Sequence, residues 1–402
     1  IRSIFLFLFL ITINLQPIFA QNQPVQVDTR LTFHSKNFLG LQNKLRSSSK
    51  GLSKINIKYN LNSLSSQISF GYEDKFTFDG SYLKYTTGIA TYGVGSVDRH
   101  WSFSKNTSLI LSHNAPPSKS IYLKLKNKFS YDWLPSKSHW SLEIFNGLTD
   151  DNPNGVKPML LGLRAVLSPT KGLDFELVQT SQWGGRGYDN GISALNAALI
   201  GNTNDKSNAN INKMAGFGVS YLIAKNLLPL RIYGQMIGED EAGNLPSCYA
   251  YLAGLEWSNT RIKYPTTLGI ETVDTRIKKT SHGNCGPNTF YNNSVYNHTN
   301  YENTMGAAID TEGTSLEFFG HSKLSKNVNI KYSTKAILIN DKNWFYHRLS
   351  TNRKTGLMNS IGITWAQNNL KFNGNIYYQD FILDKVNIQK GYGIGISSSI
   401  KF

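Results

Sequence analysis

Long hydrophobic runs are almost absent from this sequence. Beyond residue 20 there is no stretch of about 18 apolar residues, the length that a bilayer-spanning helix requires. This excludes a membrane protein built from many transmembrane helices. Acidic residues are also scarce, since 26 Asp and Glu stand against 42 Lys and Arg and give a net charge of +16. Such a charge points first to nucleic acid as a partner.

Recognisable catalytic motifs are missing as well. The chain contains no GxSxG, HExxH or P-loop string, so the sequence predicts no enzyme, no catalytic residue, no metal site and no cofactor. Aromatic residues, by contrast, make up 12% of the chain. This content excludes disorder as the dominant state, because disordered chains carry far less apolar surface.

The N-terminus has the pattern of a secretory signal peptide. Residues 1–20 carry a single charge at Arg2, followed by an apolar run and a small residue at Ala20. This order of regions is typical of an export signal, and we expect the mature chain to begin at Gln21; a short membrane anchor is the alternative. Because an exported protein does not meet a genome, no nucleic-acid partner is expected.

The last segment of the chain has the pattern of a strand with two different faces. One face of residues 391–402 carries, at every second position, Tyr392, Ile394, Ile396, Ser398, Ile400 and Phe402. Glycine and polar residues occupy the other face, as expected for a strand between lipid and a polar lumen. The terminal aromatic residue, Phe402, is typical of the barrel-assembly signal of bacterial outer-membrane proteins. The final strand of a soluble β-sandwich is the alternative.

Counting back from Phe402 predicts a barrel. Segments with alternating, β-branched or aromatic residues occur about eighteen times between residues 53 and 402, and they include 88–97 and 106–112. Short connectors alternate with long ones, as in outer-membrane barrels. The long connectors, all assigned to the outer side, are 147–157, 183–213, 239–247, 276–313, 340–355 and 380–390.

The predicted fold is therefore all-β: a transmembrane antiparallel outer-membrane β-barrel of about eighteen strands, with long extracellular loops. It is expected to occupy residues 53–402 after a signal peptide at 1–20. Residues 21–52 show no clear spanning strand and are expected to form a short periplasmic lead or an inner plug. An even strand number places both termini in the periplasm.

Four ordered blocks of the sequence resemble a known family. They are GSYLKYTTGIATYGVGSVDRHWSFSKNTSLILSHNAPP at 80–117, VKPMLLGLRAVLSPTKGLDFELVQTSQWGGRG at 156–187, GEDEAGNLPSCYAYLAGLEW at 238–257 and YNNSVYNHTNYENTMGAAIDTEGTSLEFF at 291–319. Together they are similar to the Wzi-type capsule assembly family of outer-membrane proteins. The resemblance implies an eighteen-stranded barrel with a lectin-like role, which binds and anchors capsular or related surface polysaccharide and assists capsule assembly.

The assigned outer loops carry residues suited to holding a polysaccharide. Aromatic faces pack under sugar rings, and Arg or Lys pair with acidic groups. The polysaccharide-binding candidates are Trp183, Arg186, Tyr188, Arg276, Lys278, Trp344, Arg348 and Arg353. Interface aromatics also form girdles in any barrel, and basic loops also pair with lipopolysaccharide phosphates. The expected partners are therefore acidic capsular polysaccharide or exopolysaccharide, lipopolysaccharide with outer-membrane lipid, and the barrel assembly machinery.

Two further groups of residues stand out. Asp98, Arg99 and Trp101 follow segment 88–97, and the strand count places them near the periplasmic side, where we expect a lumen ion pair or a turn; gating or glycan handover is the alternative. Cys248 and Cys285 are both expected on the outer side. Export through an oxidising compartment favours a disulfide between them, while two free thiols or metal ligands remain alternatives.

Three functions remain open at the level of the sequence. A surface polysaccharide-binding barrel is favoured, and a porin-like channel for small anionic solutes or sugars is the alternative. A barrel enzyme that acts on lipid or envelope polymer would require a buried Ser-His-acid cluster, for which the sequence offers only chance pairings.

Overall fold

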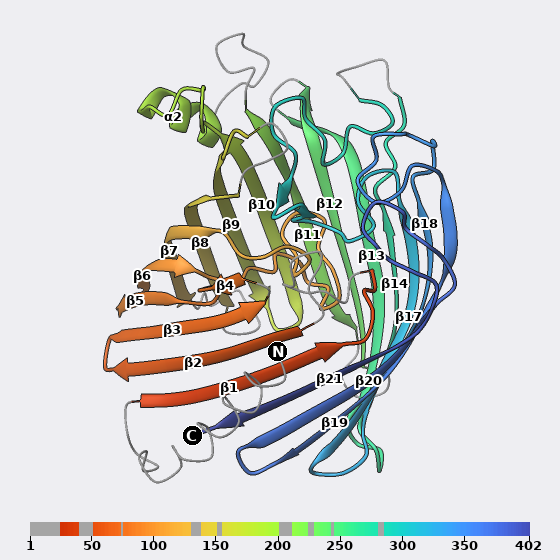
Figure 1. The fold of residues 1–402 in the computed structure, drawn as a ribbon. Coiled ribbons are helices and arrows are strands. Elements are labelled where there is room, and N and C mark those ends of the chain that lie inside the picture. Colours follow the sequence, from red (N-terminus) through yellow and green to blue (C-terminus); the bar gives the residue numbers. More distant parts are fainter. Residues whose placement is uncertain are drawn as a thin grey trace.

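The structure is a large antiparallel β-barrel (Figure 1). It is a computed structural model that describes residues 25–39, 51–73, 75–129, 138–150, 155–200, 211–223, 229–242, 245–279 and 285–402. Within these residues no helix is long and apolar enough to cross a membrane. The main sheet holds 19 strands, of which β4 (Lys75–Thr77) is a short arm on β3, and the other eighteen form the closed wall. The predicted fold class and strand number are confirmed.

The wall strands follow one another around the barrel in chain order. They are β1 (Val25–His34), β2 (Gly51–Leu61), β3 (Leu64–Glu73), β5 (Tyr82–Thr87), β6 (Ala90–Ser96), β7 (Lys119–Phe129), β8 (Ser138–Leu148), β9 (Met159–Thr170), β10 (Leu173–Trp183), β11 (Asn212–Ile223), β12 (Leu230–Ala242), β13 (Leu245–Asn259), β14 (Thr266–Asp274), β17 (Thr314–Lys323), β18 (Val328–Ile339), β19 (Lys354–Gln367), β20 (Leu370–Gln379) and β21 (Gly391–Lys401). A two-stranded hairpin of β15 (Thr299–Asn300) and β16 (Asn303–Thr304) lies in the connector after β14.

The first and last strands close the barrel. β1 pairs with β2 on one side and with β21 on the other, with Asp28 opposite Lys401 and Phe33 opposite Ile396. The expectation that residues 21–52 precede the barrel is therefore wrong for 25–34, which form a wall strand. Both ends of the wall meet at one rim, because the backbone N–H of Phe402 donates to the carbonyl of Val27 (2.8 Å). The connectors at this rim are short, and we call it the short-connector end.

Alternation sets the two faces of each wall strand. On β21 the side chains of Tyr392, Ile394 and Ile396 are exposed on the outer face, while Gly393 and Gly395 are buried toward the lumen. β10 repeats the pattern, with exposed Leu177 beside buried lumenal residues. This period of two gives an apolar belt outside and a polar lumen inside, as in membrane barrels.

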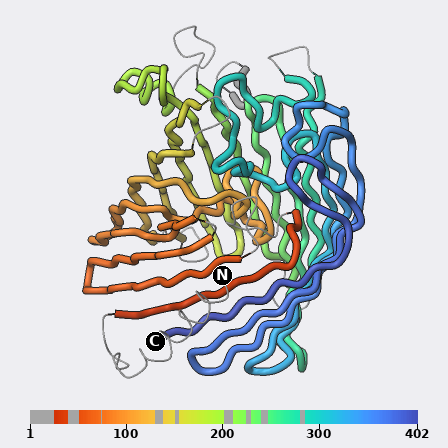
Figure 2. Tube along the Cα trace, in the orientation of Figure 1, coloured from red at the N-terminus to blue at the C-terminus, as the bar shows by residue number. Residues whose placement is uncertain are grey.

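Segment 106–112 is not a wall strand. Residues 97–118, which join β6 to β7, leave the wall at the end opposite the chain termini and fold into the lumen, where they appear as the orange tube inside the barrel (Figure 2). The predicted strand at 106–112 is therefore wrong. Leu109, Ile110 and Leu111 are three consecutive buried residues, because lumenal groups surround this segment on all sides.

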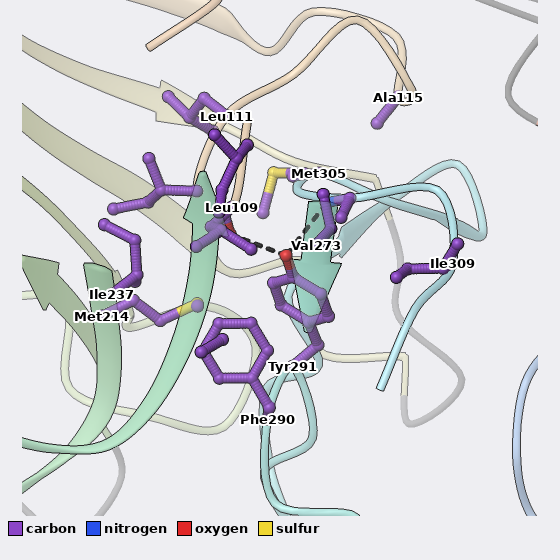
Figure 3. Packing of buried hydrophobic residues seen from close by; sticks show 14 of the residues in the cluster. Leu109, Leu111, Ala115, Met214, Ile237, Val273, Phe290, Tyr291, Met305 and Ile309 are labelled. Atoms are coloured by element: carbon purple, nitrogen blue, oxygen red, sulfur yellow. Dashed lines mark hydrogen bonds between the residues drawn. The ribbon is translucent and has the colours of Figure 1, made fainter. Parts of the chain in front are cut away.

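A second segment fills the lumen beside the first. The described parts of 275–313, which connect β14 to β17, pack against 97–118, and we call these two segments the plug. The Tyr291 hydroxyl donates to the carbonyl of Leu109 (2.7 Å), as Figure 3 shows, and accepts from the N–H of Ala307 (2.9 Å). The plug therefore has a packed apolar core of its own, continuous with the inner wall.

Polar residues of the wall fix the plug in place. Gln235 on β12 donates to the carbonyl of Trp101 (2.6 Å) and accepts from the N–H of Leu109 (2.8 Å). Glu271 on β14 accepts from Ser104 of the plug and from the Tyr233 hydroxyl. These buried polar groups each find a partner, as buried hydrogen-bonding groups in folded proteins do.

Candidate functional site

Three long connectors are joined at the end opposite the chain termini. Tyr188, between β10 and β11, packs against Tyr296 of the plug with ring centroids 5.6 Å apart and the rings tilted. Arg348, between β18 and β19, binds Asn292 and Asp310 of the plug. The plug segment 275–313 is thus the element on which the other long connectors rest.

A disulfide ties this segment to the wall. Cys248 near the start of β13 is bonded to Cys285, 37 residues further along, with Cα atoms 5.2 Å apart. The predicted bond is present, and the alternatives of free thiols and metal ligands do not apply. Among the described residues, no group of three or more His, Cys, Asp or Glu side chains could hold a metal ion.

The connector between β18 and β19 presents an exposed aromatic surface. Phe345 and Tyr346 are 66% and 73% exposed, their rings meet edge to face at 5.5 Å, and Trp344 lies 6.1 Å from Tyr346. We call these three residues the aromatic platform. Lys385, from the connector between β20 and β21, lies 5.1 Å from the Phe345 ring centroid. Phe345 and Lys385 are not among the predicted binding residues, because neither belongs to a sequence motif that indicates a binding site.

Polar groups of two connectors shape the platform. The Asn340 amide accepts from the N–H of Trp344 (2.7 Å) and donates to the carbonyls of Trp344 and Ser350. Asp384 accepts from the hydroxyls of Ser350 (2.8 Å) and Thr351 (2.9 Å). Burial opposes its charge, yet these hydrogen bonds hold the pKa of Asp384 at about 2. Two connectors are therefore joined beneath the exposed rings.

Arg348 is a structural residue of this connector. Its guanidinium is largely buried and pairs with Asp310. Burial alone would raise the pKa of Asp310, but the neighbouring Arg348 lowers it. A buried pair of this kind holds the connector on the plug, because either charge alone would be left without compensation. Its position takes Arg348 out of the exposed surface to which the sequence assigned it.

Trp183 is also buried, on the outer face of the wall. Its ring is 3% exposed and packs with Leu161, Ala197 and Ala198, and its indole N–H donates to Asn146 (3.2 Å). The two alanines belong to α2 (Ile192–Ile200), an uncharged helix that lies outside the barrel at the long-connector rim (Figure 1). Trp183 thus anchors α2 to the lipid side of the wall.

The other predicted binding residues remain on the surface. Arg186, Arg276, Lys278 and Arg353 are exposed, while Tyr188 is half-buried. Arg276 pairs with the neighbouring Asp274 (2.8 Å). These groups lie on long connectors, but no contact between them joins them into one cluster.

Asp98, Arg99 and Trp101 belong to the plug. They follow β6 at the end opposite the chain termini, so their predicted place near the terminal side is wrong; the misassigned strand at 106–112 had reversed the count. Arg99 pairs with Glu143 of β8 (2.8 Å) in the lumen, Asp98 lies 3.1 Å from His113, and Trp101 is 1% exposed. The expected lumen ion pair is present.

The profile of the family described as capsule assembly protein Wzi matches residues 19–392. The chain belongs to this family. One relative of this chain is an uncharacterized 55.8 kDa protein in the cps region of Klebsiella pneumoniae. The two are 26% identical over 206 residues. That match spans 50% of this chain and 41% of the relative.

Solved structures support the same fold for this Wzi family chain. The Escherichia coli outer membrane protein Wzi, a carbohydrate-binding β-barrel involved in group 1 capsule assembly, has a TM-score of 0.77 and 19% identity, covering 96% of this chain and 86% of that one. OprD from Pseudomonas aeruginosa is more distant, with a TM-score of 0.54, 9% identity, and coverage of 96% and 94%. These likenesses show an outer-membrane barrel fold.

Proposed function

We propose that this protein binds acidic capsular or related polysaccharide at its long-connector end and holds it at the cell surface during capsule assembly. The observation that carries the proposal is the aromatic platform, because two exposed rings beside a lysine can pack under sugar rings and pair with an acidic group. Membership of the Wzi family supports the same assignment.

The proposal includes an orientation. The long connectors face outward, and both chain termini face the periplasm, as in bacterial barrels with long extracellular loops. The exposed basic residues Arg186, Lys278 and Arg353 then lie where polysaccharide and lipopolysaccharide phosphates can reach them. Phe402 serves as the signal read by the barrel assembly machinery.

A binding role suits this lumen better than a channel or an enzyme. The plug packs across the lumen and is bonded to β12 and β14, which disfavours a wide passage for small anions. The buried histidines of the plug bond to backbone carbonyls, with His298 Nε2 2.7 Å from the carbonyl oxygen of Ile110. This arrangement gives them a structural rather than a catalytic role.

Glycan-array binding by the purified full-length barrel tests the proposal. The array carries acidic capsular polysaccharides and neutral dextran. The double variant Phe345→Ala/Tyr346→Ala should bind the acidic glycans about tenfold more weakly or worse, since aromatic contacts at binding surfaces are worth about 1 kcal/mol or more each.

The matched control is Tyr92→Ala, which removes a ring that is 53% exposed on the lipid face of β6. It should leave glycan binding unchanged. Equal binding by the platform variant and the wild type would overturn the proposal.

A further inference from the structure

The lumen contains a cavity that the plug does not fill. Its volume is about 750 Å³, within the usual range of ligand sites. Its wall comes largely from the strands around the closing seam, where β20, β21, β1 and β2 lie side by side. We call it the seam cavity. Figure 1 shows these strands as the dark blue and red ribbons that meet near the termini.

A row of cations crosses the seam. Lys371 on β20 lies opposite Ser399 on β21, Ser399 lies opposite Arg30 on β1, and Arg30 lies opposite Lys54 on β2. All four residues line or flank the seam cavity, and Lys371 and Arg30 are exposed within it. Two strand spacings separate these two side chains, about 10 Å. Like charges placed opposite each other across strands are destabilising, so the row is not explained by stability of the wall.

Further cations surround this row. Lys331 on β18 and Lys401 on β21 also line the seam cavity and are exposed. Among the described residues, no ion pair joins Arg30, Lys331, Lys371 or Lys401 to an acid, although the lumen pairs charges elsewhere, as in Lys335 with Glu317 (2.8 Å).

Most carboxylates of the seam cavity lie apart from Arg30 and Lys371. Glu73 ends β3, and Asp79 and Asp98 belong to connectors, all at the opposite end of the wall. The carbonyl of Asp79 accepts from Lys54 (2.6 Å), and Asp98 lies 3.1 Å from His113. Asp28 is the exception, since it lies opposite Lys401 on the neighbouring strand. The part of the cavity near the short-connector end is therefore cationic.

Neutral polar groups lie beside the cations. Thr364 donates to Asn373 (2.8 Å), and Asn373 donates to Ser397 (2.9 Å), which makes a ladder across β19, β20 and β21. The side chains of Asn375 and Ser399 also line the cavity and have no hydrogen-bond partner among the described residues. Amides and hydroxyls of this kind match sugar hydroxyls, and the cations match carboxylates.

We propose that the seam cavity is a second binding site, which takes a carboxylate-bearing segment of saccharide from the short-connector end. Arg30 and Lys371 hold the carboxylates, and Asn375 and Ser399 bind hydroxyls. The choice of a saccharide as the ligand rests on the proposed function, but the site is separate from the aromatic platform.

Calorimetric titration of the purified full-length barrel with trigalacturonate tests the site. The double variant Arg30→Gln/Lys371→Gln should bind about tenfold more weakly, since it removes two charge-assisted contacts. The matched control is Lys126→Gln/Lys128→Gln, which removes two exposed lysines of β7 that the same alternation turns toward the lumen, outside the cavity lining. The control should bind as the wild type does.

Two comparison ligands define the chemistry. Maltotriose, which is neutral, and inorganic phosphate should both bind more weakly than trigalacturonate. Equal binding of maltotriose or of phosphate overturns the assignment, and so does a seam variant that binds trigalacturonate like the wild type. If the double variant fails to fold, Lys371→Gln alone is measured. The conservative variant Arg30→Lys, which keeps the positive charge, should bind trigalacturonate with most of the wild-type affinity.

The same titration separates this proposal from the platform. The Phe345→Ala/Tyr346→Ala variant should still bind trigalacturonate at the seam. If that variant loses polysaccharide while the seam variant loses nothing, the second site is wrong and the surface site stands. If only the seam variant loses binding, the surface site is wrong and the seam site stands.

Discussion

At the scale of single residues, buried histidines link the plug to pH. His298 is fully buried, stacks on Tyr291 at 5.7 Å, and bonds to the carbonyl of Ile110. Burial lowers its pKa to about 4 from an ordinary value of 6.5. Between these two values an opened plug binds a proton that the closed plug does not. The stability of the closed plug therefore falls as the pH drops from about 6.5 to about 4.

The contribution of His298 to the pH dependence of plug stability can be measured. His298 alone should make the plug about 2 kcal/mol less stable against opening at pH 5 than at pH 7, and His298→Gln should remove that part. His100, whose pKa burial also lowers to about 4, keeps its own contribution in the variant. Hydrogen exchange of residues 97–118, corrected for intrinsic rates, measures it at both values. An unchanged pH dependence in the variant would show that His298 does not control opening.

Trp183 was predicted to lie in an exposed binding loop, but in the structure α2 covers it on the outer face of the wall. Its replacement by Ala should free α2 from the wall, with a loss of about 3 kcal/mol or more of local stability, because a large buried ring and its packing are removed. Limited proteolysis near α2 reports this, with Tyr346→Ala as the control that should cut like the wild type. Equal resistance of Trp183→Ala would contradict the anchoring role.

The residue types in the outer connectors could be predicted, but their partners could not. Arg348 has the sequence context of a surface base, yet its partner Asp310 lies 38 residues earlier in the chain. Phe345 and Lys385 come from different connectors that meet only after folding. A single sequence does not reveal such contacts, which depend on how the plug packs.

At the scale of elements, alternation predicted most wall strands and failed at two segments. Val25, Val27, Leu31 and Phe33 alternate on β1, but Thr29 interrupts the apolar series and weakens the pattern. Segment 106–112 contains three consecutive apolar residues, which is not a period of two, and it belongs to the plug. One true strand was missed and one false strand was added, so the predicted number of strands stayed at eighteen. The predicted direction of the strands was reversed only before residue 106.

The disulfide is the covalent bond between the described part of the plug segment 275–313 and the wall. Its removal by Cys285→Ser should destabilise that segment by up to about 4 kcal/mol, since the bond closes a loop of 37 residues. The barrel itself should persist, because its strands pair independently of this bond. Proteolysis of the connector with and without a reducing agent measures the effect, and the wild type under reduction should match the variant. A variant as resistant as the oxidised wild type would contradict it.

At the scale of the whole molecule, many of the cations behind the net charge of +16 lie in two regions. Some cations lie on the long connectors with the aromatic platform, and others line the seam cavity near the termini. A barrel that exposes only alternate residues to lipid can carry such charge inside its wall and at its rims. Nucleic acid, which the charge alone first suggests, is excluded by the predicted export signal, and the partner that we propose at both places is acidic polysaccharide.

Retention of polysaccharide on cells tests the central claim most directly. A strain that lacks this protein is complemented with the wild type, with Phe345→Ala/Tyr346→Ala, or with Tyr92→Ala, and cell-attached and shed polysaccharide are measured at equal barrel levels. We expect the wild type and Tyr92→Ala to retain polysaccharide, and the platform variant to shed most of it. Equal retention by the empty strain or by the platform variant would contradict the account.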